Sequence, residues 1–361
     1  MTTSNGVKDY QKELADLIMI VAKEGASDLH ISVGRHPTVR ISGELIPLLK
    51  KQILTPEDTA GLIFAMLKED RQKELFEKRE IDFSYNFQDK VRFRVNAFYQ
   101  RGFLGMALRL IPVGIKDIKS LNLPETLLSF TRKGQGFFLA VGPTGHGKST
   151  TLASMIDVIN HERAEHIITV EDPIEYIFIQ DKSIIDQREV QSDTYDFKRA
   201  LRSMFREDVN VAMIGEMRDH ETISAAVTAA ETGHLIFSSL HTNNAAQTID
   251  RVLDSFPPAQ QNQIRSQLAS TIIGIFSQRL IPRVSGGLIP AYELLIANHA
   301  VRNLIRENKV HEIDMVIETS SDAGMISFNR SLMELVRQGE ITMENALAYS
   351  LNPAALQALS K

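Results

Sequence analysis

The sequence predicts two domains, a larger α/β domain built on a mainly parallel sheet and a smaller α+β domain before it. The length of 361 residues, 43% of them hydrophobic, is enough for more than one core. After Gly136, short apolar runs alternate with amphipathic helices, the pattern of a parallel sheet covered on both faces. We place the smaller domain at 1–111, an interdomain linker at 112–124 and the larger domain at 125–361.

The first domain begins with a helical pattern, since Leu14, Leu17, Ile18 and Val21 recur at helical spacing. A second helical run covers 55–80, with Thr55 as its expected N-cap. The expected strands of this domain lie within 26–48 and at 83–87, 91–100 and 104–111. Pro112, Gly114 and Pro124 then interrupt a stretch without a clear period, which is typical of a linker.

The second domain is predicted from four short apolar runs that read as buried strands. They are FFLAV (137–141), IITV (167–170), VNVAMI (209–214) and LIFSSL (235–240). A helix beginning at Ser149 should present Leu152, Met155, Ile156 and Ile159 on one face. From about residue 256 onward we expect mostly helix.

The composition argues against several classes of protein. With 45 acidic and 40 basic side chains the net charge is −5, so no excess of positive charge indicates a nucleic-acid or anionic-membrane partner, although a local basic patch stays possible. The absence of cysteine excludes disulfides and thiolate metal sites. Neither a signal peptide nor a spanning apolar run is evident, and we expect a soluble cytoplasmic protein.

A phosphate-binding loop is predicted between the strand FFLAV and the helix that follows it. The nine residues of this expected ATP-binding segment are Gly142, Pro143, Thr144, Gly145, His146, Gly147, Lys148, Ser149 and Thr150. The order of strand, loop and helix directs backbone N–H groups and a helix N-terminus at phosphate oxygens, and it disfavours a ligand-free glycine-rich turn. We expect Lys148 to reach the β- and γ-phosphates and the Ser149 hydroxyl to ligate Mg²⁺.

His146 is an unusual residue within this loop. Phosphate contacts in such loops come from the backbone, so its side chain is expected to point outward as a bystander. A direct contact to the nucleotide or to a neighbouring subunit is the alternative.

Carboxylates follow two of the predicted strands. Glu171, Asp172 and Glu175 come after IITV, where Pro173 stops the chain from continuing as a central strand. This edge of a parallel sheet is where ligands bind, although a solvated acidic turn is the alternative. Glu216 ends the next strand, where phosphate-loop enzymes hold the metal shell, so we predict that these two segments and the loop together form an ATPase site.

Two histidines, His234 and His241, flank the strand LIFSSL. A metal pair is disfavoured because a whole strand separates them and no cysteine or clustered carboxylate completes a site. Contacts to the γ-phosphate region and a purely structural role are the two remaining interpretations.

Four arginines of the first domain are candidates for a charge-neutralising role. Arg92 and Arg94 share one face of a predicted strand, which by itself indicates only a solvated side. The functional interpretation is that Arg92, Arg94, Arg101 or Arg109 faces a nucleotide across a domain or subunit boundary, as an arginine finger does.

Several motifs together carry a specific resemblance over nearly the whole chain. They are GASDLHIS, RFRVNAFYQR, ALRLIP, GPTGHGKST, VEDPIEY, QREV, IGEMRD and AETGHLIFSSLHTNNAAQTIDRV. In these the sequence resembles the PilT family of type IV pilus retraction ATPases, within the secretion-ATPase superfamily.

The resemblance implies a cytoplasmic homohexameric ring with a PAS-like N-terminal domain and a RecA-like ATPase domain. It implies that ATP binds between the two domains with Mg²⁺, that Glu175 polarises the attacking water and that Glu216 is the Walker B carboxylate. The N-terminal arginines would sense the nucleotide, and His234 and His241 would couple its state to domain rotation. The implied partner is an inner-membrane platform protein, through which the ring docks without inserting into the membrane.

Two features favour a retraction motor within the superfamily. Pilus-extension and type II secretion ATPases have longer chains, commonly with a four-cysteine zinc site, whereas this sequence contains no cysteine. In addition, AVRNLIRE (300–307) is similar to a motif associated with retraction motors. The departures are His146, where serine is frequent, and REDVNV, where an Asp-Pro-Asp segment is frequent. The alternatives are an accessory paralogue, an extension or secretion motor, a non-hydrolysing scaffold, and a nucleic-acid translocase, which the acidic composition disfavours.

Overall fold

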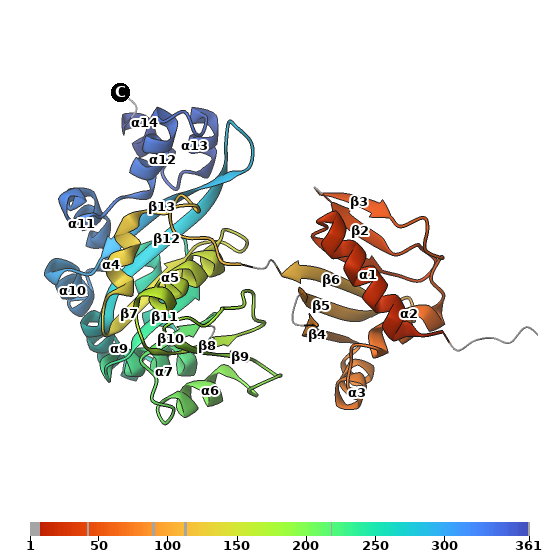
Figure 1. Cartoon of the computed structure of the whole chain (residues 1–361). Helices are drawn as coiled ribbons and strands as arrows, with labels where there is room; N and C mark the ends of the chain where they lie inside the picture. The colour runs from red at the N-terminus through yellow and green to blue at the C-terminus, as the bar shows by residue number, and fades with distance from the viewer. Residues whose placement is uncertain (1–7, 42, 89–90, 112–113, 218, 360–361) are drawn as a thin grey trace, which may run out of the picture. The chain divides into compact units, whose positions relative to one another are not determined.

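The computed structural model describes residues 8–41, 43–88, 91–111, 114–217 and 219–359 (Figure 1). The chain divides into two compact units, Met1–Val113 and Gly114–Lys361. Each has its own buried core. We describe each unit by itself.

In its described residues, the first unit combines an antiparallel sheet with three helices (Figure 1). Its elements in chain order are α1 (Tyr10–Glu24), β1 (Asp28–Ile31), β2 (Thr38–Ile41), β3 (Glu44–Pro47), α2 (Pro56–Phe64), α3 (Glu69–Lys78), β4 (Glu80–Phe87), β5 (Val91–Gln100) and β6 (Phe103–Ile111). The strands pair in the order β3-β2-β1-β6-β5-β4, and every pair is antiparallel.

The core of this unit joins α1 to the sheet. Leu14, Leu17, Ile18 and Val21, the four residues predicted to share a helix face, are all buried. They lie in one cluster with alternate residues of β5, of which Phe93 and Val95 are fully buried. The period of 2 on β5 leaves its arginines on the opposite face of the strand.

The single helical run expected at 55–80 is in fact two helices, α2 and α3. Thr55 caps α2 as predicted, because its side chain accepts a hydrogen bond from the Asp58 N–H while Asp58 bonds back to the Thr55 N–H. Lys68 is extended and separates the helices. A straight helix of 26 residues would be about 39 Å long, too long for so small a core. The break lets Leu62 and Leu75 face the same core.

The described part of the second unit contains a seven-stranded sheet, surrounded by helices (Figure 1). Its strands are β7 (Gly136–Val141), β8 (His166–Glu171), β9 (Ile184–Glu189), β10 (Val211–Ile214), β11 (Leu235–Leu240), β12 (Ile272–Pro282) and β13 (Leu288–Ile296). Its α-helices are α4 (Leu128–Thr131), α5 (Lys148–Glu162), α6 (Phe197–Met204), α7 (His220–Glu231), α8 (Ala245–Asp254), α9 (Pro258–Thr271), α10 (His299–Arg306), α11 (Ile313–Thr319), α12 (Phe328–Arg337), α13 (Met343–Tyr349) and α14 (Pro353–Leu359). Short 3₁₀ helices cover Glu125–Leu127, Val310–Glu312 and Ser321–Ala323.

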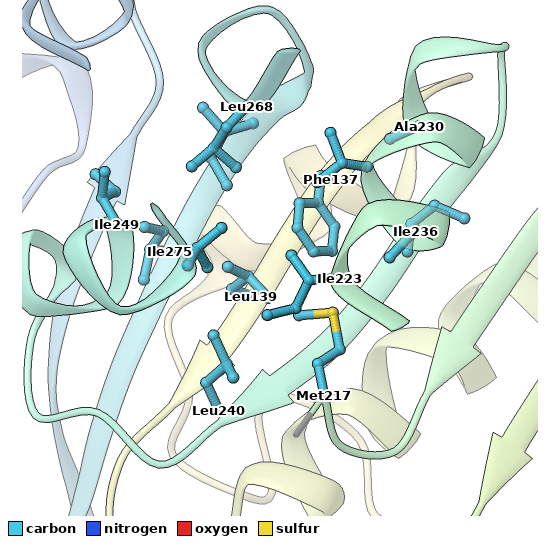
Figure 2. Close-up of a cluster of buried hydrophobic side chains, with 14 of the residues drawn as sticks. Phe137, Leu139, Met217, Ile223, Ala230, Ile236, Leu240, Ile249, Leu268 and Ile275 are labelled. Carbon is cyan, nitrogen blue, oxygen red and sulfur yellow. The ribbon is translucent and has the colours of Figure 1, made fainter. Parts of the chain in front are cut away.

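The sheet order is β13-β12-β7-β11-β10-β8-β9, and the pairs from β12 to β9 are parallel. Central strand β7 is buried on both faces. Phe137 and Leu139 enter the core formed with α6 to α11, part of which Figure 2 shows, while Phe138 and Ala140 enter the core formed with α5. This confirms the predicted α/β class with a mainly parallel sheet.

The expectation of mostly helix after residue 256 missed two long strands, β12 and β13. They form an antiparallel hairpin that joins the sheet beside β7. Figure 1 shows α12, α13 and α14 gathered at one end of this hairpin. The hairpin was overlooked because β12 and β13 carry glutamine, arginine and glutamate among their apolar residues, so their runs do not read as uninterrupted strands.

Most of the predicted linker is described, and it belongs to the second unit. Ile118 and Leu123 are buried in the core around α5. Pro112 lies outside the described residues, as does Arg218 of the IGEMRD motif. Across the described part of the chain, we find no helix with both the length and the apolar character needed to span a bilayer.

Glu293 is a buried carboxyl on β13, 7% exposed. Its Oε1 accepts a hydrogen bond from the Ala245 N–H at 2.8 Å, at the first turn of α8. Burial raises the pKa of Glu293 to about 7, against this hydrogen bond, which favours the charged form. The Glu293 carboxyl of the folded protein therefore keeps a proton that it releases in the unfolded chain, where its pKa has the ordinary value of about 4.3.

Because of the raised pKa of Glu293, we expect the free energy of unfolding to fall as the pH rises. Because the folded pKa lies above the unfolded one, the penalty is absent at low pH and grows as the pH rises to about 7. Glu293→Gln should gain up to about 3 kcal/mol of stability relative to wild type between pH 4.5 and pH 8. Denaturant unfolding at a series of pH values measures this, with exposed Glu344→Gln as the control. A difference that does not vary with pH would contradict it.

Candidate active site

The predicted phosphate loop, Gly142–Gly147, connects β7 to α5 as expected. Gly142 has φ +143°, and a Cβ there would lie 2.3 Å from the Gln278 carbonyl oxygen, so no larger residue fits. Gly145 and Gly147 are left-handed, with φ +79° and +83°. Because Gly147 has no side chain to cap α5, the first N–H groups of this helix remain available to an anion.

Lys148 is the first residue of α5, and it is buried. Its Nζ donates hydrogen bonds to the carbonyl oxygens of Gly142 at 2.9 Å and Pro143 at 3.0 Å. The side chain therefore curls back over the loop that it follows. Burial lowers the pKa of Lys148, and the carboxylates of Glu216 and Glu175 oppose that shift. The ammonium thus lies within the field of both predicted catalytic carboxylates.

His241 links Lys148 to Glu216. Its Nδ1 lies 3.3 Å from Lys148 Nζ and 3.3 Å from Thr144 Oγ1, and its Nε2 lies 3.1 Å from Glu216 Oε1. These contacts are all satisfied when the proton is on Nε2, so that Nδ1 accepts and Nε2 donates. The chain from ammonium to imidazole to carboxylate joins the first residue of α5 to the segments that follow β11 and β10.

The acidic segment after β8 separates into buried and exposed groups. Glu171 is buried at the strand end, where Pro173 follows and the strand stops as predicted. Asp172 and Glu175 are exposed. The Glu175 N–H donates to Glu171 Oε2 at 3.3 Å, so Glu171 supports the turn that carries Glu175. The exposed Glu175 carboxylate remains free to meet solvent and substrate.

Glu171 has an altered pKa. Burial raises the pKa of this carboxyl to about 7, although hydrogen bonds to the charged form act in the opposite direction. These come from Thr169 Oγ1 at 2.6 Å, the Glu175 N–H and Gln187 Nε2 at 3.4 Å. The sequence grouped Glu171 with two solvent-facing carboxylates, whereas the structure gives it a supporting place beneath them.

Ser149 and Thr150 follow Lys148 on α5. The Ser149 residue is exposed, and its hydroxyl lies at the start of the helix next to the loop. Thr150 Oγ1 instead forms a hydrogen bond with the Tyr176 hydroxyl at 2.8 Å, which ties α5 to the acidic segment. Of these two hydroxyls, Ser149 is therefore the one left for a metal ion.

His146 is not the outward-pointing bystander that the sequence favoured. Its Nδ1 accepts a hydrogen bond from the Leu280 N–H on β12 at 2.9 Å. Burial, reinforced by the charges of Arg279 and Lys148, lowers the pKa of His146, so the ring stays neutral and can accept. The ring fastens the loop to β12, a strand that the sequence analysis did not identify.

His234 and His241 lie at opposite ends of strand β11. His234 precedes β11, and its carbonyl accepts from the Gly136 N–H at the start of β7, whereas the phosphate loop follows the end of β7. Six strand residues span about 20 Å, which excludes a contact between His234 and phosphate on the same chain's loop. His234 instead bonds to the Ala229 carbonyl and lies edge-on to Phe205. Within this chain, these contacts favour the structural interpretation of His234 over a contact to phosphate.

The four arginines belong to the first unit and do not form one group. Arg94 and Arg109 are paired in register on β5 and β6, and Arg92 lies two residues away on the same face. Arg109 Nε donates to Asp28 Oδ1 at 2.9 Å. Arg101 lies in the turn between β5 and β6, at the other end of these strands, with φ +52°.

Asp28 is the buried counterion of this arginine face. Burial alone would raise the pKa of Asp28, but hydrogen bonds from Ser27 and Arg109 outweigh it and lower the pKa. Arg40 on β2 lies on its other side, at 3.8 Å. Arg109 is thus already engaged, while the Arg94 side chain is exposed on the same row.

Sequence reasoning missed several residues that hold the site together. Gln187 on β9 donates to the Tyr176 carbonyl at 2.7 Å, and Glu189 accepts from the Ile174 N–H at 3.1 Å. Both belong to the QREV motif, which was noted without a structural role. Gln278 on β12 was missed altogether, because its contacts come from residues more than 100 positions away.

Comparisons with known proteins identify the family of this chain. The family model described as "Type II/IV secretion system protein" matches residues 4–308. The type IV pilus retraction ATPase PilT of Pseudomonas aeruginosa is 42% identical over 339 residues, 92% of this chain and 97% of that protein. The type IV pilus ATPase PilU of the same organism is 39% identical over 94% of this chain and 88% of its own length.

A solved structure is similar over the full chain. The crystal structure of the pilus retraction motor PilT with bound ADP matches with a TM-score of 0.90 and 46% identity, covering 98% of this chain and 100% of that one. Because the match covers 98% of this chain, it includes both units. The chain therefore belongs to the type II/IV secretion protein family and, within it, to the PilT family of type IV pilus retraction ATPases.

Proposed function

We propose that this protein hydrolyses ATP and uses the energy to power retraction of a type IV pilus. The observation that carries the proposal is the chain of contacts from Lys148 through His241 to Glu216, beside the exposed Glu175. It places a cation, an imidazole and two carboxylates at the carboxyl ends of the parallel strands, where nucleotides bind in this architecture.

The residues divide the chemistry among themselves. The loop N–H groups and Lys148 bind the phosphates, which replace the carbonyl oxygens that Lys148 now contacts. Glu175 orients the attacking water, because its carboxylate is exposed and its backbone is fixed by Glu171. Phosphoryl transfer depends mainly on positioning and charge stabilisation, so the rigidity of these contacts is itself part of the catalysis.

The donor set suits Mg²⁺. The Ser149 hydroxyl and the Glu216 carboxylate are hard oxygen ligands, and Mg²⁺ characteristically takes one or two protein ligands together with phosphate oxygens and water. Among the described residues no group of three or more histidine, aspartate or glutamate side chains could hold a metal ion alone, which fits a metal that arrives with the nucleotide. When bound, Mg²⁺ would neutralise charge on the phosphates.

We further propose a homohexameric ring in which Arg92, Arg94, Arg101 or Arg109 approaches a nucleotide as a sensor or finger. Arg94, which lies beside the Asp28–Arg109 pair, is exposed, as is Arg101 in the turn. An isolated subunit should then hydrolyse slowly. The ring would act at the cytoplasmic face of the inner membrane through a platform protein, without inserting itself and without a nucleic-acid partner.

A role as accessory motor is the second candidate, because identity to PilU is 39% against 42% to PilT. The two values differ too little to separate the roles. Both candidate functions use the same site. They differ in which mutant strain would regain twitching motility when it carries this protein.

Lys148→Ala should abolish tight nucleotide binding and lower ATP hydrolysis by about 10²-fold or more, since the ammonium is the buried cation at the phosphates. Binding of a fluorescent ATP analogue and phosphate release measure the two effects. Lys182→Ala, an exposed lysine of the same unit, is the control. Unchanged affinity in Lys148→Ala would remove the loop from the proposal.

Glu175→Gln should keep ATP binding but lose about 10²- to 10⁴-fold in turnover, because the amide cannot activate water. Single-turnover hydrolysis and equilibrium binding separate these effects. Glu162→Gln, at the far end of α5, serves as the control. Full hydrolysis in Glu175→Gln would refute the role given to this carboxylate.

In a Pseudomonas aeruginosa strain lacking PilT, the wild-type gene should restore twitching motility and Lys148→Ala should not. Restoration only in a strain lacking PilU would instead favour the accessory role. Hydrolysis strongly stimulated by DNA would revive a nucleic-acid motor.

A further inference from the structure

Strand β12 presents successive residues of Ser277–Leu280 to opposite faces of the sheet. The preceding residues fix the direction, because Ile275 lies in the core with α8 and α9 and Phe276 lies in the core with α5. With a period of 2, Gln278 and Leu280 face α5, and Ser277 and Arg279 face α8. The side-chain hydrogen bonds of Ser277, Gln278 and Arg279 follow the same alternation.

On the α5 face, Gln278 holds the phosphate loop. Its side chain is 2% exposed, and its Oε1 accepts from Thr151 Oγ1 at 2.6 Å while its Nε2 donates to the His146 carbonyl at 2.6 Å. The Leu280 N–H donates to His146 Nδ1. The Gln278 carbonyl oxygen lies directly against Gly142. Both ends of the loop are therefore fixed by this strand.

On the α8 face, the same strand holds the segment that carries His241. Ser277 Oγ donates to the Asn243 carbonyl at 2.8 Å, and Arg279 Nη2 donates to Asn243 Oδ1 at 2.8 Å. Asn243 is two residues from His241, which contacts Lys148 and Glu216. Arg279 thus acts on the side of the site opposite to Gln278.

Arg279 is itself held from a third direction. Its guanidinium carbon lies 5.6 Å from the centre of the Phe328 ring on α12, and Nη1 donates to the Tyr349 carbonyl at the end of α13 at 3.4 Å. Because a guanidinium is planar and makes several directed bonds, this environment fixes the direction of the bond to Asn243. The C-terminal helices are therefore connected to the His241 segment through one side chain.

We propose that Gln278 and Arg279 are positioning residues for ATP binding and hydrolysis respectively, with Gln278 fixing the phosphate loop and Arg279 fixing the His241 segment. This rests on the proposed function of the site. Gln278 contacts the loop that we expect to bind the phosphates of both ATP and ADP. Arg279 supports the contacts among His241, Glu216 and Lys148, where charge develops during hydrolysis.

Two substitutions at adjacent positions test the proposal in the full chain. Gln278→Leu should raise the Kd for ADP and the KM for ATP about ten-fold while kcat stays within about two-fold. Arg279→Met should lower kcat about ten-fold while the Kd for ADP stays within about two-fold. Calorimetric ADP titration and steady-state phosphate release supply the numbers.

Matched controls make the same chemical changes elsewhere in the second unit. Gln267→Leu removes a glutamine of α9 that bonds to Glu231, and Arg283→Met removes an arginine just after β12 that pairs with Glu340. Both should behave as wild type in ADP affinity and kcat.

Opposite kinetic signatures at neighbouring positions would not arise from general destabilisation. The proposal is overturned if both variants change the same parameter, or if neither differs from its control. If Gln278→Leu does not fold, the double variant Gln278→Leu/Thr151→Val replaces it, because it also removes the Thr151 hydroxyl that would have lost its partner. The same rise in the Kd for ADP is expected for this double variant. If the wild-type chain has no ATPase activity, the proposed function is refuted instead. The ADP affinities of wild type and Gln278→Leu would still test the half of the proposal that concerns Gln278 and the loop.

Discussion

The burial of the Lys148 ammonium is the constraint on which the rest of the site depends. A charge removed from water must be compensated by hydrogen bonds and opposite charge. The Gly142 and Pro143 carbonyls supply the hydrogen bonds, and the carboxylates of Glu216 and Glu175 supply the field. These groups come from the ends of β7, β10 and β8, so the sheet must place three strand ends together before the lysine can be buried.

This requirement explains why the supporting residues are arranged in layers beneath the exposed carboxylates. Glu171 fixes the backbone of Glu175, and Thr169 and Gln187 in turn hold Glu171. On the other side, β12 holds the loop through Gln278 and His146. The site therefore consists of a few exposed groups on a buried polar network, whose members satisfy each other's hydrogen bonds as the low dielectric of the interior demands.

The first unit solves a similar problem on a smaller scale. Asp28 is buried between Arg109 and Arg40, so its charge is compensated on both sides, while Arg94 extends the row and is exposed. Together, the four side chains of Arg40, Arg94, Arg109 and Asp28 carry a net positive charge. This charge is local, and the overall composition of the chain conceals it.

The sequence by itself determined the α/β class, the four strands β7, β8, β10 and β11, the loop Gly142–Gly147 and the presence of the charged groups Lys148, Glu175 and Glu216 after these strands. These follow from local rules, because period, glycine placement and residue type are written in neighbouring positions. Only the tertiary structure decided that His146 bonds to β12, that His234 lies at the wrong edge for phosphate, and that Glu171 is buried. It also decided the role of Gln278, whose partners lie 127 and 132 positions away. Such pairings depend on which strands become neighbours in the sheet, and no local pattern in the chain specifies that.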